Sequence, residues 1–490
     1  PWREPRGFAS TMTTVALSRS RTAVPSLASQ PAESSFAQKL AFKLYLLFMV
    51  SWFLHLPARA EVLGQLRLDL LLVLAIAGAI FATARGSIER LDSRINRLLI
   101  ALFAYAIVTL PFVEWPGSVL KHGIPELIKA VVFYYFTALL VTSEQKLKRV
   151  LFVFTVCQAL RVLEPVYLHV TQGYWGSAAS MDGGTEFMSR LSGAPSDVVN
   201  PNGLAAVIVT VIPFVHYLWT QRPSGRIAYV GLMPVLLYAL MLTGSRSGMV
   251  ALAATFMLIW LQSHRKALLT LAGVVVVMFS IPRLSEDLQD RYLSIVNPNT
   301  RNYYTADQRV EGIKDDFRVA MRRPFFGHGL GTSREANGNF GTHYQPSHNL
   351  FTEVAQELGF VGMPLFGALL VAIGISVRRA LRTLKTSPSA NPLLVRLCCA
   401  LQVWFVVNIL SAVFTYGLSS NEWYFMAGFA NVITLMLSTS AEPHASEPER
   451  SRGPSAPTRV NPVVSPRLAR RARQASSARP PRTAAPGPRS

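Results

Sequence analysis

The chain has 490 residues, of which 50% are hydrophobic and only 15% are charged. Soluble domains carry about 25% charged residues, so this composition argues against a soluble globular protein. The formal net charge is +21, but much of the excess Lys and Arg lies in short loops and terminal tails, which argues against a nucleic-acid partner.

Apolar segments of about 17 to 22 residues recur along the chain, and each can cross a hydrocarbon core about 30 Å thick as a helix. The pattern predicts an all-α polytopic membrane protein with about twelve transmembrane helices. The three cysteines lie inside such segments, so neither a disulfide framework nor a metal site is expected. The predicted spans are 40–57, 68–84, 98–113, 122–141, 149–169, 201–219, 226–243, 247–262, 266–282, 359–377, 393–414 and 422–438.

Lys and Arg are distributed unevenly between the loops. The loop after every even-numbered span is basic, and cytoplasmic loops are the ones that carry such an excess. This alternation predicts an even number of spans with both termini in the cytoplasm. The short loops after odd-numbered spans carry fewer basic residues, namely Arg59, Arg67, Lys121, Arg190 and Arg246, and the loop after span eleven carries none.

Two tails flank the predicted membrane domain, which covers residues 40–438. Residues 1–39 and 441–490 are rich in Ser, Pro and Arg without apolar periodicity, so both are predicted to be disordered cytoplasmic tails. The first of them lacks the apolar core of a secretory signal. Because the sequence begins at Pro1, Met12 is a plausible start.

Two loops on the predicted outer side are long, at 170–200 and 283–348. The second lies between spans nine and ten and is too varied for a linker, so we expect it to fold against the membrane surface and to carry the chemistry. Within it, Thr305 and Gln308 have the spacing of a capping box and precede an apolar helical pattern. Arg309 is predicted in the first turn of this amphipathic helix, as an anion ligand or as part of a solvated face.

The turn at 243–248, Thr-Gly-Ser-Arg-Ser-Gly, joins spans seven and eight on the outer side. Its glycines and serines allow backbone N–H groups to point at a ligand, and the planar fork of Arg246 matches phosphate oxygens. An arginine at the outer membrane edge suits a lipid diphosphate. Alternatively, Arg246 extends to the headgroups as other juxtamembrane arginines do, and the turn alone does not decide.

His348 precedes a predicted helix at 350–358 that leads into span ten. A neutral imidazole can accept the proton of a hydroxyl group, although an isolated histidine is more often structural. His328 and His343 are weaker candidates because their surroundings resemble a flexible loop. The glycines of 324–331 indicate a shaped turn, since no strand–helix–strand unit surrounds them as a nucleotide-binding loop would require.

Ionisable residues inside spans are a further set of candidates, because each costs a few kcal/mol in the bilayer. Lys129 with Glu126, and Arg161 with Glu164, are predicted in the outer halves of their spans. Lys129 and Arg161 could line a chamber that opens on the same side as Arg246. Both are i,i+3 pairs, however, and mutual charge neutralisation is the simpler interpretation.

Together these segments resemble the O-antigen ligase and polymerase superfamily of bacterial membrane proteins, over about residues 40–438. The residues that carry the resemblance are Asn-Pro-Asn-Gly-Leu-Ala at 200–205, the turn at 243–248, Arg309 ahead of 324–331, and Ser-His-Asn at 347–349 running on to Glu-Leu-Gly-Phe-Val-Gly at 357–362. The resemblance implies a glycosyltransferase of the GT-C-like architecture in the bacterial inner membrane. It also implies an inverting reaction without metal or cofactor.

The resemblance further implies that a glycan passes from an undecaprenyl-diphosphate carrier to an acceptor hydroxyl at the periplasmic face, during assembly of lipopolysaccharide O-antigen or exopolysaccharide. In such enzymes, arginines matching Arg246 and Arg309 hold the diphosphate, and a histidine matching His348 activates the acceptor. The acceptor, whether lipid, glycan or protein, stays open. A polymerase or a protein O-glycosylation ligase would use the same kind of site.

The competing class is a secondary transporter, since twelve spans with cytoplasmic termini is a common transporter plan. Against it, the two halves show no internal repeat, and the candidate residues gather outside the membrane instead of at its midplane. A noncatalytic scaffold for envelope assembly is the third possibility.

Overall fold

The computed structural model describes residues 35–441, except for short gaps at 84–87, 182–185, 198, 281, 283, 298, 301–303 and 343. Almost all of the two predicted tails lies outside the described residues. The first helix, α1, begins at Phe36, earlier than the predicted span start at 40. Ser35 explains the early start, because its hydroxyl accepts a hydrogen bond from the Gln38 N–H (3.2 Å) and caps the helix.

Each predicted span overlaps one long helix of a bundle. These helices are α1 (Phe36–Phe53), α4 (Leu68–Ala82), α5 (Arg94–Val108), α7 (Ile124–Leu140), α8 (Glu144–Gln172), α9 (Pro201–Phe214), α10 (Pro223–Leu242), α11 (Arg246–Gln262), α12 (Lys266–Ser280), α16 (Leu350–Thr386), α17 (Pro392–Ser411) and α18 (Asn421–Ala441). Short helical segments join or extend them, namely α2 (Leu56–Arg59), α3 (Glu61–Gln65), η2 (Ile88–Leu91), η3 (Leu110–Phe112), α6 (Pro116–Ser118), η4 (Val119–Gly123) and η5 (Val215–Trp219).

The length and hydropathy of these helices define a multi-pass membrane protein. Within the described ranges, seven helical segments are long and apolar enough to cross a membrane. The helices α4 and α11 and the first part of α12 are apolar but shorter. The number of twelve spans therefore stays a prediction.

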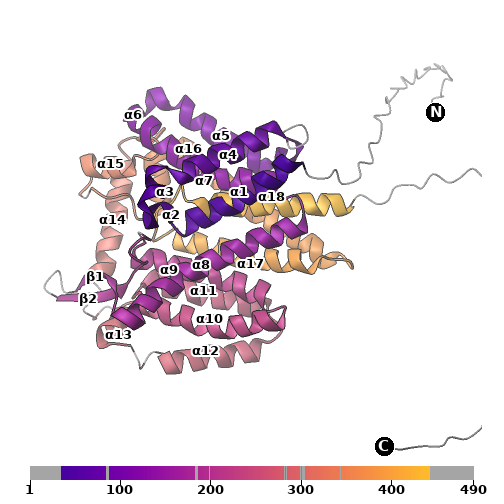
Figure 1. Cartoon of the computed structure of the whole chain (residues 1–490). Coiled ribbons are helices and arrows are strands. Elements are labelled where there is room, and N and C mark those ends of the chain that lie inside the picture. The colour runs from indigo at the N-terminus through magenta and orange to yellow at the C-terminus, as the bar shows by residue number, and fades with distance from the viewer. Residues whose placement is uncertain are drawn as a thin grey trace, which may run out of the picture. The chain divides into compact units, whose positions relative to one another are not determined.

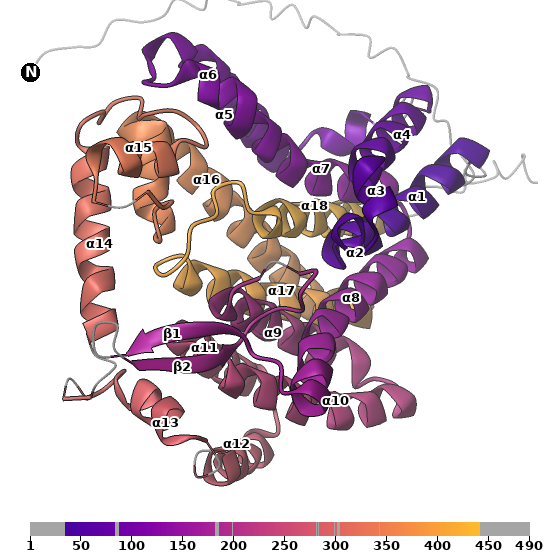
Figure 2. The ribbon, with the colours of Figure 1, turned by 60° about the vertical axis from the view of Figure 1, so that its left-hand side comes forward.

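The two predicted outer loops are folded, and they lie at one end of the bundle (Figure 1). The shorter loop forms an antiparallel hairpin of β1 (Gly176–Met181) and β2 (Glu186–Leu191), with Gly176 opposite Leu191. The longer loop contains α13 (Glu286–Leu293), α14 (Tyr304–Ala320) and α15 (Ser333–Phe340). Figure 2 shows the hairpin, α13 and α14 on the same side of the bundle.

The predicted amphipathic helix is α14, but one detail of the prediction is wrong. Because α14 begins at Tyr304, Arg309 lies in its second turn and not in the first. The positive end of the helix dipole acts mainly within the first turn, so it contributes less at Arg309 than expected. The side chain of Thr305, the predicted cap, lies outside the described residues.

The bundle has two apolar cores. One joins α1, α4, α5, α7, α16 and α18, and the other joins α9, α10 and α11, while α8 and α17 contribute to both. Phe154 of α8 lies in the first core, where its ring contacts those of Phe53, Phe214, Trp404 and Phe425. Helices in a bilayer associate through such close packing, since lipid tails are as apolar as the side chains.

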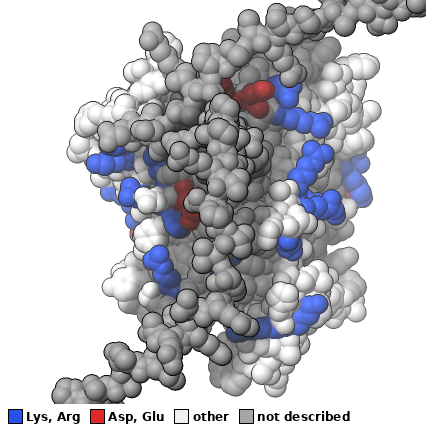
Figure 3. Space-filling model, turned by 90° about the vertical axis from the view of Figure 1, so that its right-hand side faces the viewer, with Lys and Arg blue, Asp and Glu red and all other residues white. Residues whose placement is uncertain are grey.

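The end of the bundle opposite the folded loops is basic. Figure 3 shows this face, on which Lys and Arg side chains predominate over Asp and Glu. Several of the loops predicted to be cytoplasmic, such as 146–149 and 378–385, supply basic residues there. The charge distribution agrees with the predicted alternation, and the side of the membrane remains a prediction.

Candidate functional site at the loop end of the bundle

A kink in α16 shapes the site. At Gly359 the backbone leaves the helical conformation (φ 65°, ψ −179°), as expected for a helix predicted to end at 358. The loop 324–331 docks into the gap, where Phe360 N–H donates to Pro324 O (2.7 Å) and His328 N–H donates to Gln356 O (2.6 Å). The glycine-rich segment is therefore a shaped turn, as predicted, that completes the hydrogen bonding of a broken helix.

His348 stands immediately before α16. Asn349 caps the helix, because its side-chain oxygen Oδ1 accepts hydrogen bonds from the N–H groups of Phe351 (2.8 Å) and Thr352 (3.2 Å). The His348 side chain is exposed, and its ring stacks with that of Tyr416 at 6.1 Å between centroids and 18° between planes. The helix cap thus fixes the backbone of a histidine whose ring remains accessible.

A buried polar network fixes the other side of the same loop. The Ser347 hydroxyl donates to Asp316 Oδ2 of α14 (2.7 Å), and Asn337 Nδ2 of α15 donates to Asp316 Oδ1 (2.8 Å). Gln356 Nε2 of α16 donates to the Asp316 carbonyl (2.9 Å) and to Asn337 Oδ1 (2.8 Å). Asp316 therefore ties α14, α15 and α16 together directly beside His348.

The electrostatic surroundings of His348 favour a neutral imidazole. Burial of part of the ring is the largest effect that lowers its pKa below the usual value, and the nearby charge of Arg309 lowers the pKa further. The carboxylate of Asp316 opposes both effects. A neutral imidazole at neutral pH is the form that can accept a proton.

Four arginines from four elements lie near one another, and one of them, Arg309, lies near His348. Arg190 belongs to β2, Arg246 to α11, Arg291 to α13 and Arg309 to α14. Burial, together with the charges of the other arginines, lowers the pKa of Arg190 and of Arg291 to about 10. Burial also lowers the pKa of Arg309. All remain protonated at neutral pH, so their mutual repulsion favours an anionic ligand.

Arg246 does not extend to the headgroups. Its side chain is only 9% exposed, and Nη1 donates to the Ser294 hydroxyl at the end of α13 (2.9 Å). The charges of Arg291 and Arg309 both act on it. The structure therefore brings Arg246, Arg309 and His348 together, although they come from distant parts of the chain.

The turn that precedes Arg246 is held by hydrogen bonds to its backbone. Arg190 Nε donates to the Thr243 carbonyl (2.7 Å), and Arg291 Nε donates to the Gly244 carbonyl (2.7 Å). Ser245 caps α11, since its hydroxyl accepts the Gly248 N–H (3.2 Å). The expectation that this turn offers its N–H groups to a ligand is therefore wrong in part, because those of Gly244, Ser245 and Gly248 are engaged inside the turn.

Arg161 and Glu164, one of the two pairs predicted to neutralise each other within a single helix, have other partners. Arg161 forms an ion pair with Asp197, Nε to Oδ2 at 2.7 Å, and Glu164 pairs with Arg59. The interpretation as an i,i+3 pair is wrong here, because the loops after α1 and β2 bring these partners to α8. Lys129 is exposed on α7, and its predicted role in lining a chamber is not tested by this position.

We expected His328 to lie in a flexible loop, and this prediction is wrong. It is completely buried, and Nε2 lies 3.0 Å from the Val319 carbonyl. Its ring stacks on Trp115 and lies at a tilt against Phe340. Its position is structural. His343 lies outside the described residues.

Several residues of the site escaped prediction. Two buried glutamates of α16 hold the loops around His348: Glu353 accepts the Gly417 N–H (2.7 Å), and Glu357 accepts the Gly331 N–H (2.7 Å). From the sequence, Arg190 was noted only as a basic residue of a loop, and neither Arg291 nor Asp316 was singled out. The one available signal was the i,i+4 spacing of the glutamates in an otherwise apolar segment, and it does not identify their partners.

The fold and the site define a multi-pass membrane protein with a cluster of arginines and an adjacent histidine. Residues 230–367 match the family model described as O-antigen ligase. This segment contains Arg246, Arg291, Arg309 and His348, so the predicted relationship to the O-antigen ligase superfamily is confirmed on the segment that carries most of the site. A comparison with curated proteins finds no match to the chain.

Proposed function

We propose that the protein is an inverting glycosyltransferase that moves a glycan from a lipid diphosphate carrier to an acceptor hydroxyl. The observation that carries the proposal is the nearness of His348 to Arg309, which belongs to the cluster of four arginines. A proton acceptor beside a diphosphate-binding site is what this displacement needs. The family match supports a membrane enzyme of the O-antigen ligase or polymerase type.

Each group has a role in the proposed step. His348 takes the proton of the acceptor hydroxyl as its oxygen attacks the anomeric carbon of the carrier-linked sugar. The new bond between oxygen and carbon forms on one face while the bond from that carbon to the diphosphate oxygen breaks on the other. The electron pair goes to the diphosphate, whose growing charge Arg246 and Arg309 stabilise. The configuration at the anomeric carbon is inverted.

The carrier in this proposal is undecaprenyl diphosphate, and the site faces the periplasm from the inner membrane. The basic face at the opposite end of the bundle supports this orientation, because cytoplasmic loops carry the excess of Lys and Arg. The step uses no metal ion, since the arginines supply the positive charge. Lys129 and Arg161 are proposed to line the chamber through which the substrates approach.

The experiment is glycan transfer from a defined undecaprenyl-diphosphate oligosaccharide by the purified full-length protein in vesicles, with and without a chelator. We expect Arg246→Ala and Arg309→Ala each to reduce turnover about 10² to 10³-fold. His348→Ala should reduce it about 10² to 10⁴-fold while carrier binding persists.

Matched controls separate the site from the fold. Arg318→Ala removes an exposed arginine of the same helix as Arg309, and His264→Ala removes an exposed histidine between α11 and α12. Both controls should retain full activity. Unchanged transfer in all three site variants would refute the proposal. In cells, accumulation of carrier-linked polymer indicates a ligase, whereas accumulation of single repeats indicates a polymerase.

A further inference from the structure

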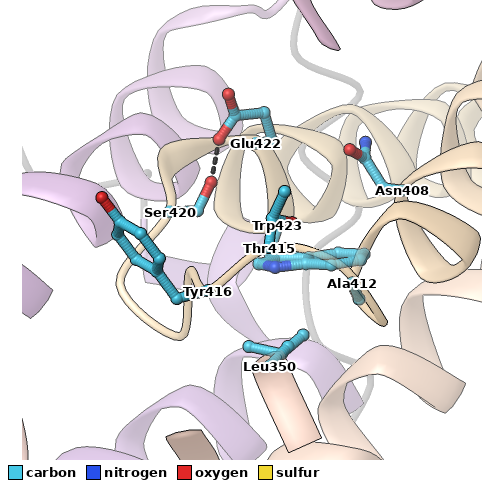
Figure 4. A pocket seen from close by; sticks show the side chains of 8 residues that line it. All are labelled: Leu350, Asn408, Ala412, Thr415, Tyr416, Ser420, Glu422 and Trp423. Atoms are coloured by element: carbon cyan, nitrogen blue, oxygen red, sulfur yellow. Dashed lines mark hydrogen bonds between the residues drawn. The ribbon is translucent and has the colours of Figure 1, made fainter. Parts of the chain in front are cut away.

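A pocket beside His348 has a lining that suits a sugar. It is formed by the end of α17, the connection to α18 and the first turn of α18, together with the start of α16 (Figure 4). The space inside it is about 280 Å³, its open mouth included. Because that space includes open solvent, the pocket receives only part of a sugar, whose ring would lie across the mouth with its hydroxyls directed inside. The lining residues are Leu350, Asn408, Ala412, Thr415, Tyr416, Ser420, Glu422 and Trp423.

The polar groups of this pocket can bind hydroxyls. Thr415 and Ser420 supply hydroxyl groups, and Glu422 supplies a carboxylate. Figure 4 shows the hydrogen bond that the Ser420 hydroxyl donates to this carboxylate. The amide nitrogen of Asn408 is buried and has no hydrogen-bond partner among the described residues. A buried donor without a partner is destabilising unless a ligand or water satisfies it, so its position in the pocket wall indicates a hydrogen-bond acceptor inside.

The aromatic side chains supply the second requirement for a sugar. Tyr416 is 52% exposed and Trp423 forms a buried wall. The faces of pyranose rings present C–H groups, which pack against aromatic rings, while their hydroxyls need acceptors and donors at the rim. A lipid chain would leave the Asn408 amide without a partner, and this lining therefore favours a saccharide.

The pocket and His348, the proposed base, share contacts with the same loop. Tyr416 lines the pocket and stacks on the ring of His348. The loop that carries Tyr416 is held by Glu353, which accepts the N–H groups of Gly417 (2.7 Å) and Leu418 (3.0 Å). From the other side, Asn349 Nδ2 donates to the Val413 carbonyl (3.1 Å). A sugar bound in the pocket would thus lie against the same aromatic ring as the imidazole.

We propose that this pocket binds a saccharide unit of the acceptor, so that the hydroxyl activated by His348 belongs to a glycan and not to a protein side chain. The inference rests on the proposed function and names its acceptor class. It assigns Asn408 and Glu422 to the sugar hydroxyls and Tyr416 to the sugar face.

The test is saturation-transfer difference NMR on the full-length protein in nanodiscs. The probes are the methyl glycosides of glucose, galactose, mannose and N-acetylglucosamine, and a peptide that contains Ser and Thr. We expect at least one glycoside to bind, and its affinity to fall at least tenfold in Asn408→Leu and in the more conservative Glu422→Gln. The peptide should give no signal that depends on these residues.

A matched pair on one loop provides the control. Tyr416→Leu should weaken glycoside binding, whereas Phe414→Leu, at an aromatic residue that is 41% exposed and does not line the pocket, should not. Binding of the undecaprenyl-diphosphate donor should persist in every pocket variant, which reports that the protein is folded.

The outcomes distinguish this inference from the proposed function. Glycoside binding that is absent, or equal in wild type, Asn408→Leu and Glu422→Gln, would overturn the saccharide pocket. Peptide binding that depends on these residues would overturn it in favour of a protein acceptor. Arg246→Ala should abolish donor binding and leave glycoside binding intact, so failure of the donor site would be seen separately.

Discussion

The guanidinium of Arg309 lies close enough to His348 for its charge to lower the pKa of the imidazole. Arg309 comes from α14 and His348 from the loop before α16, and Asp316 connects the two elements through Ser347. A diphosphate bound by Arg309 would offset that charge. If the arginines bind an anion as proposed, the proton affinity of His348 and the occupancy of that site are therefore linked.

The first prediction concerns pH. If neutral His348 is the base, turnover is constant above its pKa and falls as the pH drops through that pKa. Burial and Arg309 lower this pKa, so the acid limb should lie below the usual pKa of histidine, about 6.5. Arg309→Gln removes a positive charge that lowers the pKa of His348, so the acid limb of the remaining activity should move to higher pH. Profiles of kcat/KM for the donor against pH measure the shift, because they report the free enzyme, in which no diphosphate offsets the charge of Arg309. A limb unchanged by the substitution would contradict the prediction.

Arg190 is predicted to be a positioning residue. Its Nε holds the Thr243 carbonyl and its Nη2 donates to Asn202 Oδ1 (3.0 Å), so one side chain joins the turn before Arg246 to the start of α9. A lysine presents a single nitrogen and cannot form both bonds in this geometry. Arg190→Lys should raise the KM for the carrier about tenfold or more, because a small misplacement of a binding group is costly.

The acceptor provides the control for Arg190. The KM for the acceptor should stay within twofold of wild type in Arg190→Lys, and Arg318→Lys should change neither constant. A general loss of stability would instead lower the active fraction and leave both KM values unchanged. Steady-state kinetics with each substrate varied in turn therefore separates positioning from folding.

Two adjacent aspartates of α14 give a matched pair. Asp316→Ala removes the buried carboxylate that accepts from the Ser347 hydroxyl and the Asn337 amide, and each hydrogen bond to a charged group contributes about 1.5 to 3 kcal/mol. Asp315→Ala removes only a contact with the exposed side chain of Arg318 and one with the Thr342 hydroxyl, and such surface pairs contribute about 0 to 1 kcal/mol. In detergent, the unfolding temperature should fall by a large amount for Asp316→Ala and by a small amount for Asp315→Ala. Equal losses would mean that the Asp316 network does not hold the loop.

The helical bundle could be predicted because its signal is local. A bilayer demands long apolar segments, and every predicted span overlaps a helix in the structure. The candidates Arg246, Arg309 and His348 could be placed on one side because alternating loops must lie on alternating sides. Neither argument requires knowledge of which segments pack together.

The features of the site that could not be predicted depend on contacts between segments that are distant in the sequence. Nothing near Arg161 indicates that its partner is Asp197, because that choice is made when the loop after β2 folds onto α8. The burial of His328 likewise depends on Trp115 and Phe340, which approach it from different segments. The sequence around His328 resembles a flexible loop and does not show that the segment is closely packed.

Gly359 provides the last prediction, because its conformation and its surroundings both exclude a side chain. A φ of 65° with a ψ of −179° is accessible essentially to glycine alone, at a cost of about 1 to 3 kcal/mol for other residues. A Cβ at this position would also lie 2.3 Å from the Phe325 carbonyl oxygen. Gly359→Ala must therefore expel the loop 324–331 from the kink.

The consequence should reach both stability and activity. Once the loop is displaced, the Phe360 N–H loses its bond to Pro324 O, and the buried groups of α16 that face the loop lose their partners. We expect a lower unfolding temperature in detergent and a loss of glycan transfer greater than tenfold. Gly367→Ala is the control in the same helix, because a Cβ there meets nothing within 4 Å. A wild-type unfolding temperature in Gly359→Ala would show that the kink does not hold the site together.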